Sequence, residues 1–320
     1  MASRLAILLL LLLIPCSSDA SGSPAPVSPA DVGGRIALAS TLVPPSPGRL
    51  SPGRGADRKA DVEKPLTERA PSPLALRVLT WGDFDAELVI KKLYASLEVT
   101  EEGRRSLAAL DQGSPEWLEA RRNRLTGSNF GAAAGHNKWK SPAALAHDML
   151  YSTFQGNDAT RWGTAHEPIA CSEYILARRA QLRKTHGDDF VFEVTHSGLN
   201  VDAQDSWMAV SPDGHVREHG QDAVLEIKCP FSKRPYAAIP PYYMDQLQGL
   251  MGVLSLPWAD FCVWTPDAFQ VTRVPFDARY WGDELRPALV RFYREVFLCA
   301  YVEKERRAAS GDHSVPPQPR

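Results

Sequence analysis

The sequence predicts an α+β fold, because its helical and extended segments are grouped rather than strictly alternating. Apolar residues recur at helical spacing between residues 114 and about 182. From residue 190 to about 231 the period changes to short runs rich in Val, Phe and Ile. One more helical segment and two more extended runs precede a final helical stretch. Helices, then a small sheet with one helix inserted, then helices is the order expected of an α+β domain.

The first 75 residues lie outside this pattern. Residues 1–20 contain a short head, an apolar run from Leu5 to Ile14 and a small, polar end, which is typical of a cleavable signal and too short to span a bilayer comfortably. Residues 21–75 are rich in Pro, Ser, Gly and Arg and have no helical or strand period, so we expect a disordered linker or a second targeting segment.

These segments favour the secretory pathway, or an organelle reached through it, as the location of a soluble mature protein without a membrane span. Plain secretion with a disordered propeptide and a misassigned gene start are the alternatives. After the linker, a single globular domain is expected over residues 76–307, followed by a disordered tail over residues 308–320.

Two helices of the domain are indicated by Ser-Pro pairs. Ser114 and Pro115 are expected to begin a helix that ends near Gly127, because Ser caps a helix and Pro suits its first turn. Ser141 and Pro142 begin the next one. A longer helix is expected to follow through "EPIACSEYILARRAQL".

The extended segments after residue 190 are predicted to form an antiparallel meander. They read "FVFEVTHSGLNV", "SWMAVSPDGHV" and "AVLEIKCPF", and Gly, Asp or Pro bounds each. "PPYYMDQLQGLMGVLSL" returns to the helical period, whereas "WADFCVWTP" and "FQVTRVPFD" indicate two more strands. The last helical stretch, about 278–307, contains Pro287, which should mark its first turn or a break.

Composition narrows the class of protein. A net charge of −2 and a pI near 6.5 argue against binding nucleic acid by bulk charge, although separate clusters of Arg and Lys could line a groove. The cysteines after residue 20 lie far apart without a CxxC pair, so they are expected to be small core residues rather than metal ligands. In an oxidising lumen one or two disulfides would be an alternative.

Glu226 and Lys228 stand out within the apolar stretch "AVLEIKCP". Side chains alternate along a strand, so these two share one face with Val224 while Leu225 and Ile227 share the other. The charged face either looks at water or lines a cleft.

Four motifs follow one another: "RWGTAHE" with Glu167, "SPDG" with Asp213, "LEIKCP", and "YMDQLQ" with Gln246. Two carboxylates with a lysine one pleat away suit metal-dependent phosphodiester hydrolysis, because hard oxygen ligands hold Mg²⁺ and the metal activates water. Lys228 would position that water or stabilise developing charge.

Each residue also has a structural explanation. Asp213 between Pro and Gly suits a tight turn. Thr164 and Glu167 form a T-x-x-E capping box, which would place Pro168 near the first turn of a helix. Glu226 and Lys228 could be an exposed cross-strand pair. The ordered combination of the four motifs makes coincidence improbable.

With "WLEARRNRLTGS" preceding them, these motifs resemble the YqaJ-type viral recombinase branch of the PD-(D/E)XK nuclease superfamily, which includes the phage lambda exonuclease. The resemblance covers about residues 114 to 265. It implies a restriction-endonuclease-like core, a small mixed sheet flanked by helices, and Mg²⁺ as cofactor with Mn²⁺ as an alternative.

The resemblance implies roles for individual residues. Asp213, Glu226 and the backbone carbonyl of Ile227 would bind the metal, with Glu167 as a further or water-bridged ligand. Lys228 would be the catalytic lysine.

Three further residues take roles from the same resemblance. Gln246 would orient water or lysine. Arg121 and Ser128 would bind a terminal 5′-phosphate, for which an Arg fork and a hydroxyl are suited.

The expected activity is therefore a 5′-to-3′ exonuclease on double-stranded DNA ends in recombination or repair, contacting mainly the DNA backbone. A homo-oligomer and a single-strand annealing protein are the partners that the resemblance adds. A structure-specific or restriction-like endonuclease and a catalytically silent DNA-binding module are the alternatives. Two features depart from the phage pattern. One is the long segment between Asp213 and Glu226, and the other is the pair of N-terminal targeting segments.

Overall fold

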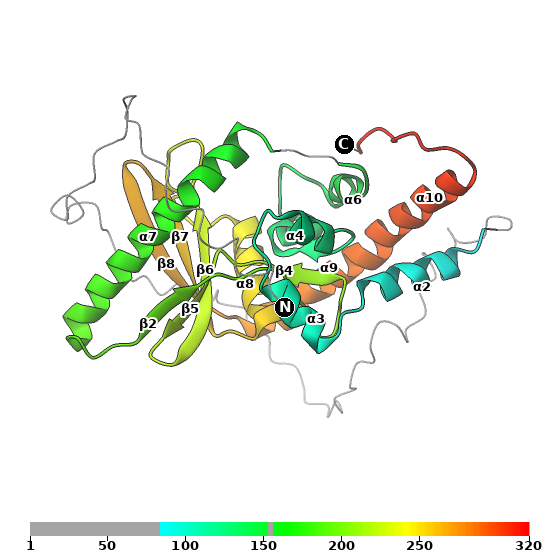
Figure 1. Ribbon diagram of the computed structural model, residues 1–320. Helices are drawn as coiled ribbons and strands as arrows, with labels where there is room; N and C mark the ends of the chain where they lie inside the picture. The colour runs from blue at the N-terminus through cyan, green and yellow to red at the C-terminus, as the bar shows by residue number, and fades with distance from the viewer. Residues whose placement is uncertain (1–83, 153–155, 320) are drawn as a thin grey trace, which may run out of the picture. The chain divides into compact units, whose positions relative to one another are not determined.

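The structure, a computed structural model, describes residues 84–152 and 156–319. The predicted signal segment, 1–20, and the predicted linker, 21–75, lie outside the described residues, as does the start of the predicted domain. Within the described residues no helix is both long and apolar enough to cross a membrane. The α+β fold class is confirmed, and Figure 1 shows the sheet strands with helices packed around them.

A five-stranded mixed sheet, in the order β2, β5, β6, β7, β8, is the centre of the fold. Its strands are β2 (Phe192–Thr195), β5 (Gly214–Glu218), β6 (Gln221–Lys228), β7 (Trp258–Thr265) and β8 (Ala268–Pro275). All neighbours are antiparallel except β6 and β7, which run parallel. A parallel pair needs a crossover, and helix α8 (Pro241–Leu254) provides it.

The two faces of β6 pack in separate apolar clusters. Val224 belongs to the cluster that contains Leu247 of α8, whereas Leu225 and Ile227 belong to the cluster that contains Tyr174 of the long helix α7 (Asp158–His186). Helices α8 and α7 therefore cover opposite faces of the sheet. The predicted alternation of side chains along β6 is confirmed.

A second, three-stranded sheet corrects the predicted meander. Its order is β1 (Leu125–Thr126), β4 (Met208–Val210) and β3 (Asn200–Val201). β4 pairs in parallel with β1, so the segment around Met208 leaves the main sheet and packs with Leu125 in the larger core. The meander prediction was wrong here because the partner strand lies before α7, far away in sequence.

The helices before α7 begin at the predicted N-caps, but one of them ends earlier than predicted. Ser114 and Ser141 accept backbone hydrogen bonds as N-caps of α4 and α6. The helix expected to reach Gly127 ends at Ala120, because Asn123 has a positive φ of 60° and Arg124 bonds the Ala120 carbonyl with its side chain. These elements are α2 (Ala86–Leu97), α3 (Glu101–Ala108), α4 (Pro115–Ala120), η3 (Gly127–Asn129), α5 (Phe130–Ala133) and α6 (Pro142–Tyr151).

The long helix α7 (Asp158–His186) begins earlier than predicted. Its N-cap is Asn157, whose side chain accepts a hydrogen bond from the Thr160 N–H. The capping box at Thr164 is therefore wrong, and Pro168 lies inside the helix, where it cannot donate the usual backbone hydrogen bond.

The C-terminal helical stretch contains two π-helical segments. Its parts are η4 (Tyr280–Leu285), α9 (Arg286–Arg291), η5 (Phe292–Phe297) and α10 (Leu298–Ala309). Pro287 lies in the first turn of α9, immediately after a π-helical segment, as expected of a proline in this stretch. The predicted tail begins in the last turn of α10, and its Pro316 and Gln318 contact α6 through His147 and Asp148.

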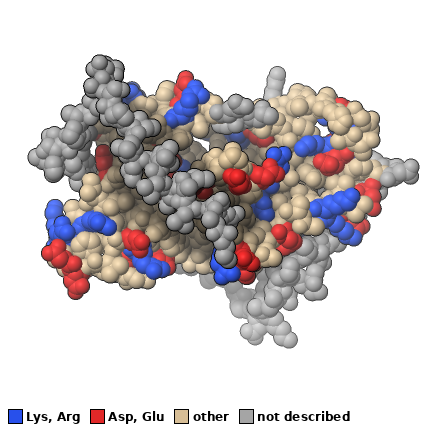
Figure 2. All heavy atoms as spheres, in the orientation of Figure 1, with Lys and Arg blue, Asp and Glu red and all other residues tan. Residues whose placement is uncertain are grey.

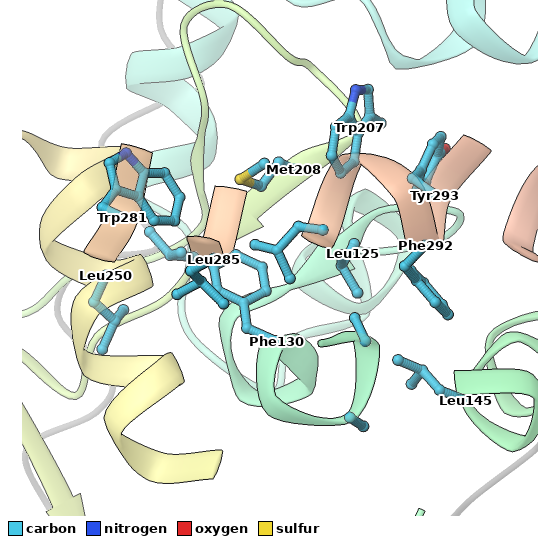
Figure 3. Packing of buried hydrophobic residues seen from close by; sticks show 14 of the residues in the cluster. Leu125, Phe130, Leu145, Trp207, Met208, Leu250, Trp281, Leu285, Phe292 and Tyr293 are labelled. Carbon is cyan, nitrogen blue, oxygen red and sulfur yellow. The ribbon is translucent and has the colours of Figure 1, made fainter. Parts of the chain in front are cut away.

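The larger core lies between α5, α8, β4 and the C-terminal helices (Figure 3). Phe130 of α5 is fully buried. It packs so close to Gly249 of α8 that a Cβ added there would lie 2.2 Å from the ring. The four cysteines of the described residues are free thiols, and Cys262 is buried in the α7-side core as predicted for a small apolar residue.

A buried ion network joins α7 to the sheet on the other side. Arg178 of α7 donates two hydrogen bonds to Glu218, at 2.7 and 2.6 Å, and Arg273 of β8 donates to both Glu218 and Asp260. Tyr174 of α7 completes it with a 2.8 Å bond to Asp260. Burial alone would raise the pKa of Glu218, but the hydrogen bonds from Arg178 and Arg273 lower it to about 2.

Arg273→Ala should lower the free energy of unfolding by about 3–5 kcal/mol, because it leaves two buried carboxylates without their shared cation. Urea unfolding of the full chain measures this change. Arg217→Ala is the matched control, since Arg217 pairs with Asp222 at the surface and its loss should leave stability nearly unchanged. Equal effects of the two substitutions would contradict the structural role of the network.

Candidate active site

Glu226 is the most deeply placed residue of the site. It is 2% exposed, and its Oε1 accepts hydrogen bonds from Lys228 Nζ and Gln246 Nε2, both at 2.5 Å. β6 supplies the first two residues and α8 the third. The alternative of a solvent-exposed pair is therefore wrong: the charged face of β6 is turned toward α8.

Asp213 lies against the same strand. Its Oδ2 accepts a 2.6 Å hydrogen bond from the N–H of Ile227, the residue between Glu226 and Lys228. Asp213 immediately precedes β5, whose first residue, Gly214, pairs with Leu225 of β6. A Cβ at Gly214 would approach Val194 to 2.9 Å, so glycine allows β5 to lie this close to β2.

Glu167 approaches from α7 on the other face. Burial, followed by the charge of Asp213, raises the pKa of Glu167 to about 7, and Lys228 opposes the increase. The carboxyl thus shares one electrostatic environment with Asp213 and Lys228. Glu226 thus contacts Lys228 and Gln246 directly, and Asp213 contacts the backbone between Glu226 and Lys228. Glu167 interacts with this group through the charges of Asp213 and Lys228.

The charges of this cluster do not balance. Burial and the neighbouring Asp213 raise the pKa of Glu226 to about 8, despite the opposing effect of Lys228. Burial alone would lower the pKa of Lys228, but Glu226 and Asp213 raise it well above its ordinary value. Three carboxyl groups share one ammonium group, so full ionisation leaves two negative charges uncompensated. A divalent cation would remove that repulsion.

The donor set fits a hard divalent cation. Oε2 of Glu226 is buried and has no hydrogen-bond partner among the described residues, which is costly for a carboxylate unless a ligand occupies it. Within residues 84–152 and 156–319 no three His, Cys, Asp or Glu side chains are arranged as a complete ligand set. Mg²⁺ needs only one or two carboxylates and keeps several waters, so Asp213, Glu226 and the Ile227 carbonyl suit it.

Arg121 follows α4, and Ser128 lies in η3, which packs against α8. The Arg121 guanidinium stacks 4.0 Å from the centroid of Trp117 and donates a 3.2 Å hydrogen bond to Thr126 Oγ1. Burial lowers its pKa to about 10, which leaves it charged at neutral pH. Ser128 is exposed in the turn η3. The structure does not bring these two residues into contact with each other or with the carboxylates.

A pocket of about 820 Å³ opens beside Arg121. Lys140 and Lys304 also line it, and Lys140 forms a 2.6 Å ion pair with Asp148. The pocket is therefore lined by basic side chains, one of which is neutralised by its ion pair with Asp148. None of the carboxylates of the β6 site belongs to it.

Two neighbours of the site were missed by sequence reasoning. Tyr243, interpreted as part of the apolar stripe of α8, lies under Lys228 with its ring centroid 5.0 Å from Nζ. Its hydroxyl is 3.3 Å from that of Tyr236. The signal was available, because Tyr243 and Gln246 are three residues apart and so lie on one side of a helix.

This fold and this cluster of carboxylates, lysine and glutamine define a nuclease, that is, a phosphodiester hydrolase. The sequence comparison agrees with that class: residues 116–256 match the family described as the YqaJ-like viral recombinase domain. The matched stretch contains the motifs on which the predicted resemblance rests. Among curated proteins no match to the chain was found.

Some solved structures with similar chains are exonucleases. LHK-Exo, an alkaline exonuclease from Laribacter hongkongensis, is 25% identical, with a TM-score of 0.46 over 62% of this chain and 99% of that chain. Its complex with dAMP gives a TM-score of 0.47 at the same identity and coverage. A phage-related exonuclease from Haemophilus somnus is 15% identical, with a TM-score of 0.38 over 58% of this chain and 96% of that one. The nuclease class is supported by the site and by the family match.

Mg²⁺ should stabilise the full chain against unfolding through Asp213 and Glu226. At a hundredfold excess over its dissociation constant, a ligand that binds only the folded state adds about 2.7 kcal/mol. Thermal unfolding with and without Mg²⁺ or Mn²⁺ measures the effect. Glu226→Gln should remove it, because an amide offers one uncharged oxygen.

Asp222→Asn is the control for that experiment. Asp222 lies on the same strand but at the surface, paired with Arg217. Its substitution should leave the metal-dependent increase intact. The same increase in Glu226→Gln as in the parent would place the cation elsewhere.

Proposed function

We propose that this protein is a divalent-metal-dependent DNA exonuclease that degrades one strand of double-stranded DNA in the 5′-to-3′ direction, in recombination or repair. The observation that carries the proposal is Glu226: a buried carboxylate with one oxygen held by Lys228 and Gln246 and the other without a partner. Such an oxygen, beside two further carboxyl groups, is suited to Mg²⁺, which would in turn bind a phosphodiester.

Bound Mg²⁺ would lower the pKa of water and neutralise charge that develops on phosphate. The chain's own residues would do the rest. Lys228 stays protonated near its carboxylates, so its ammonium can donate to negative charge on the reacting phosphate. Gln246 fixes the Glu226 side chain from α8, and Tyr243 lies under the lysine.

Arg121 supports the preference for a 5′ end. Its guanidinium is pre-ordered by Trp117 and Thr126, so little conformational entropy is lost when it binds a phosphate monoester. The exposed hydroxyl of Ser128 follows in the next turn. We expect the two to grip a terminal 5′-phosphate, although they do not contact each other in this structure.

DNA would be bound mainly through its backbone. Lys and Arg are interspersed with Asp and Glu on the face shown in Figure 2, rather than forming one continuous basic surface. Short basic clusters of this kind suit local phosphate contacts that carry little sequence information. Mg²⁺ remains the expected ion, with Mn²⁺ as an alternative.

Lys228→Ala should lower the rate of DNA cleavage by at least about a hundredfold, because it removes the cation beside the reacting phosphate. Mg²⁺-dependent stabilisation and DNA binding should remain. Strand degradation on linear duplex DNA, with Mg²⁺ or EDTA, measures the rate. Lys184→Ala, at an exposed position of α7, is the control. Parent-like cleavage by the Lys228 variant would reject its catalytic role.

Arg121→Gln should erase the preference for 5′-phosphorylated over 5′-hydroxyl ends while leaving basal cleavage. The comparison uses two otherwise identical linear duplexes and the parent chain. Arg122→Gln is the control, because Arg122 is exposed and pairs with Glu119. A retained preference in the Arg121 variant would show that another residue reads the end.

Two other functions make different predictions for the same assays. Cleavage of closed circular DNA by the parent chain would favour a structure-specific or restriction-like endonuclease. DNA binding that needs no metal, with no cleavage, would favour a catalytically silent DNA-binding module. The exonuclease proposal requires degradation that starts only at ends.

A further inference from the structure

Three aromatic rings are stacked beside the candidate site. Trp162 and His166 of α7 stack with centroids 3.8 Å apart, and His166 in turn stacks on Trp264 of β7 at 5.3 Å. The Nδ1–H of His166 donates to the Trp162 carbonyl at 2.8 Å, which fixes the ring between the two indoles. We name Trp162, His166 and Trp264, with Phe231 and Lys233 at their edge, the aromatic platform.

The platform lies at the same end of the sheet as the catalytic residues. His166 directly precedes Glu167 on α7. Trp264 directly follows Val263, which pairs with Lys228 across β6 and β7. Phe231 and Lys233 follow Lys228 within five residues. A DNA strand with a phosphate at Lys228 would therefore have its neighbouring nucleotides near these rings.

The outer residues of the aromatic platform, Phe231 and Lys233, are exposed to solvent. Trp264 is buried, but Phe231 is 53% exposed and meets Trp162 edge-on at 6.2 Å. Lys233 places its ammonium 5.0 Å from the Trp162 centroid, and its side chain is at the surface. A long, exposed lysine is easily displaced, which would open the Trp162 face.

Trp162 also has an unsatisfied polar atom. Its Nε1 is buried and has no hydrogen-bond partner among the described residues. A ring that served only to pack α7 on the sheet would more commonly have its N–H bonded or in water. Because this N–H lies in the plane of the ring, an acceptor at the ring edge, such as a phosphate oxygen, would satisfy it.

We propose that the aromatic platform stacks one unpaired nucleobase of the DNA strand held at the β6 site. This inference rests on the proposed nuclease function and adds the feature of substrate that is recognised: a base released from its pair next to the scissile phosphate. Stacking is tolerant of base identity because every base has a π face, so it fits an enzyme that reads the backbone. Lys233, displaced from Trp162, would contact a phosphate of the same strand.

The test combines DNA that lacks one base with protein variants that lack one aromatic ring of the platform. The full chain with Lys228→Ala, which should bind without cleaving, is titrated in Mg²⁺ with 5′-phosphorylated duplexes that carry one abasic residue at the first, second or third position. Loss of the stacked base should weaken binding roughly fivefold to hundredfold at one of these positions. In the Phe231→Ala and Trp162→Leu variants the same abasic residue should have little further effect.

Leu176→Ala is the control, since Leu176 is an apolar residue of α7, the helix that carries Trp162, and is 60% exposed against 53% for Phe231. It should keep the full penalty for the abasic residue. Thermal unfolding verifies that each variant is folded, and quenching of 2-aminopurine at the sensitive position provides a signal that packing alone would not give.

The outcomes separate the two proposals. An identical penalty in the parent and in the platform variants, or no penalty at any position, would overturn the platform while cleavage by the Lys228-containing chain still supported the nuclease. A chain that neither cleaves nor binds DNA would overturn both.

Discussion

The position of β6 between an antiparallel and a parallel neighbour is the constraint on which the site depends. Parallel pairing with β7 requires a crossover, and α8 makes it, so Gln246 and Tyr243 come to lie on the face that carries Glu226 and Lys228. Antiparallel pairing with β5 brings Asp213 to the backbone of the same strand. Neither neighbour alone would assemble the cluster. The carboxylates are thus held close by hydrogen-bonded ladders, even though their charges repel.

On the other face of the sheet, ion pairs with balanced charges hold helix α7 in place. α7 supplies Glu167 and two rings of the aromatic platform, Trp162 and His166, near its start, and Tyr174 and Arg178 further along. The latter two anchor the helix to β5, β7 and β8 through Glu218 and Asp260, with charges that are paired throughout. A balanced ion network therefore fixes the helix, and an unbalanced one remains where a cation and a phosphate would bind.

The sequence predicts the fold class and which candidate site residues lie together, but not every element around them. The residue types at Asp213, Glu226 and Lys228 are set by local strand geometry and by the chemistry of phosphodiester cleavage, so their order along the chain was sufficient. The second sheet was missed because Met208 pairs with Leu125 across more than eighty residues, and strands of two or three residues have no readable period. The early start of α7 was missed because Pro168 reads as a boundary, although tertiary packing tolerates it inside the helix. The side chains around Arg121 needed the structure, since Thr126 follows an irregular turn at Asn123.

The separation of the two apolar clusters on either side of β6 has an evolutionary consequence. Val224 and Leu225 are neighbours in sequence but belong to different cores, so a volume change in one core need not disturb the other. Substitutions on opposite faces should then combine nearly independently. A change in the packing between α7 and the sheet then need not alter the core between α8 and the sheet. The sheet thus divides the described part of the domain into two cores whose packing can change separately.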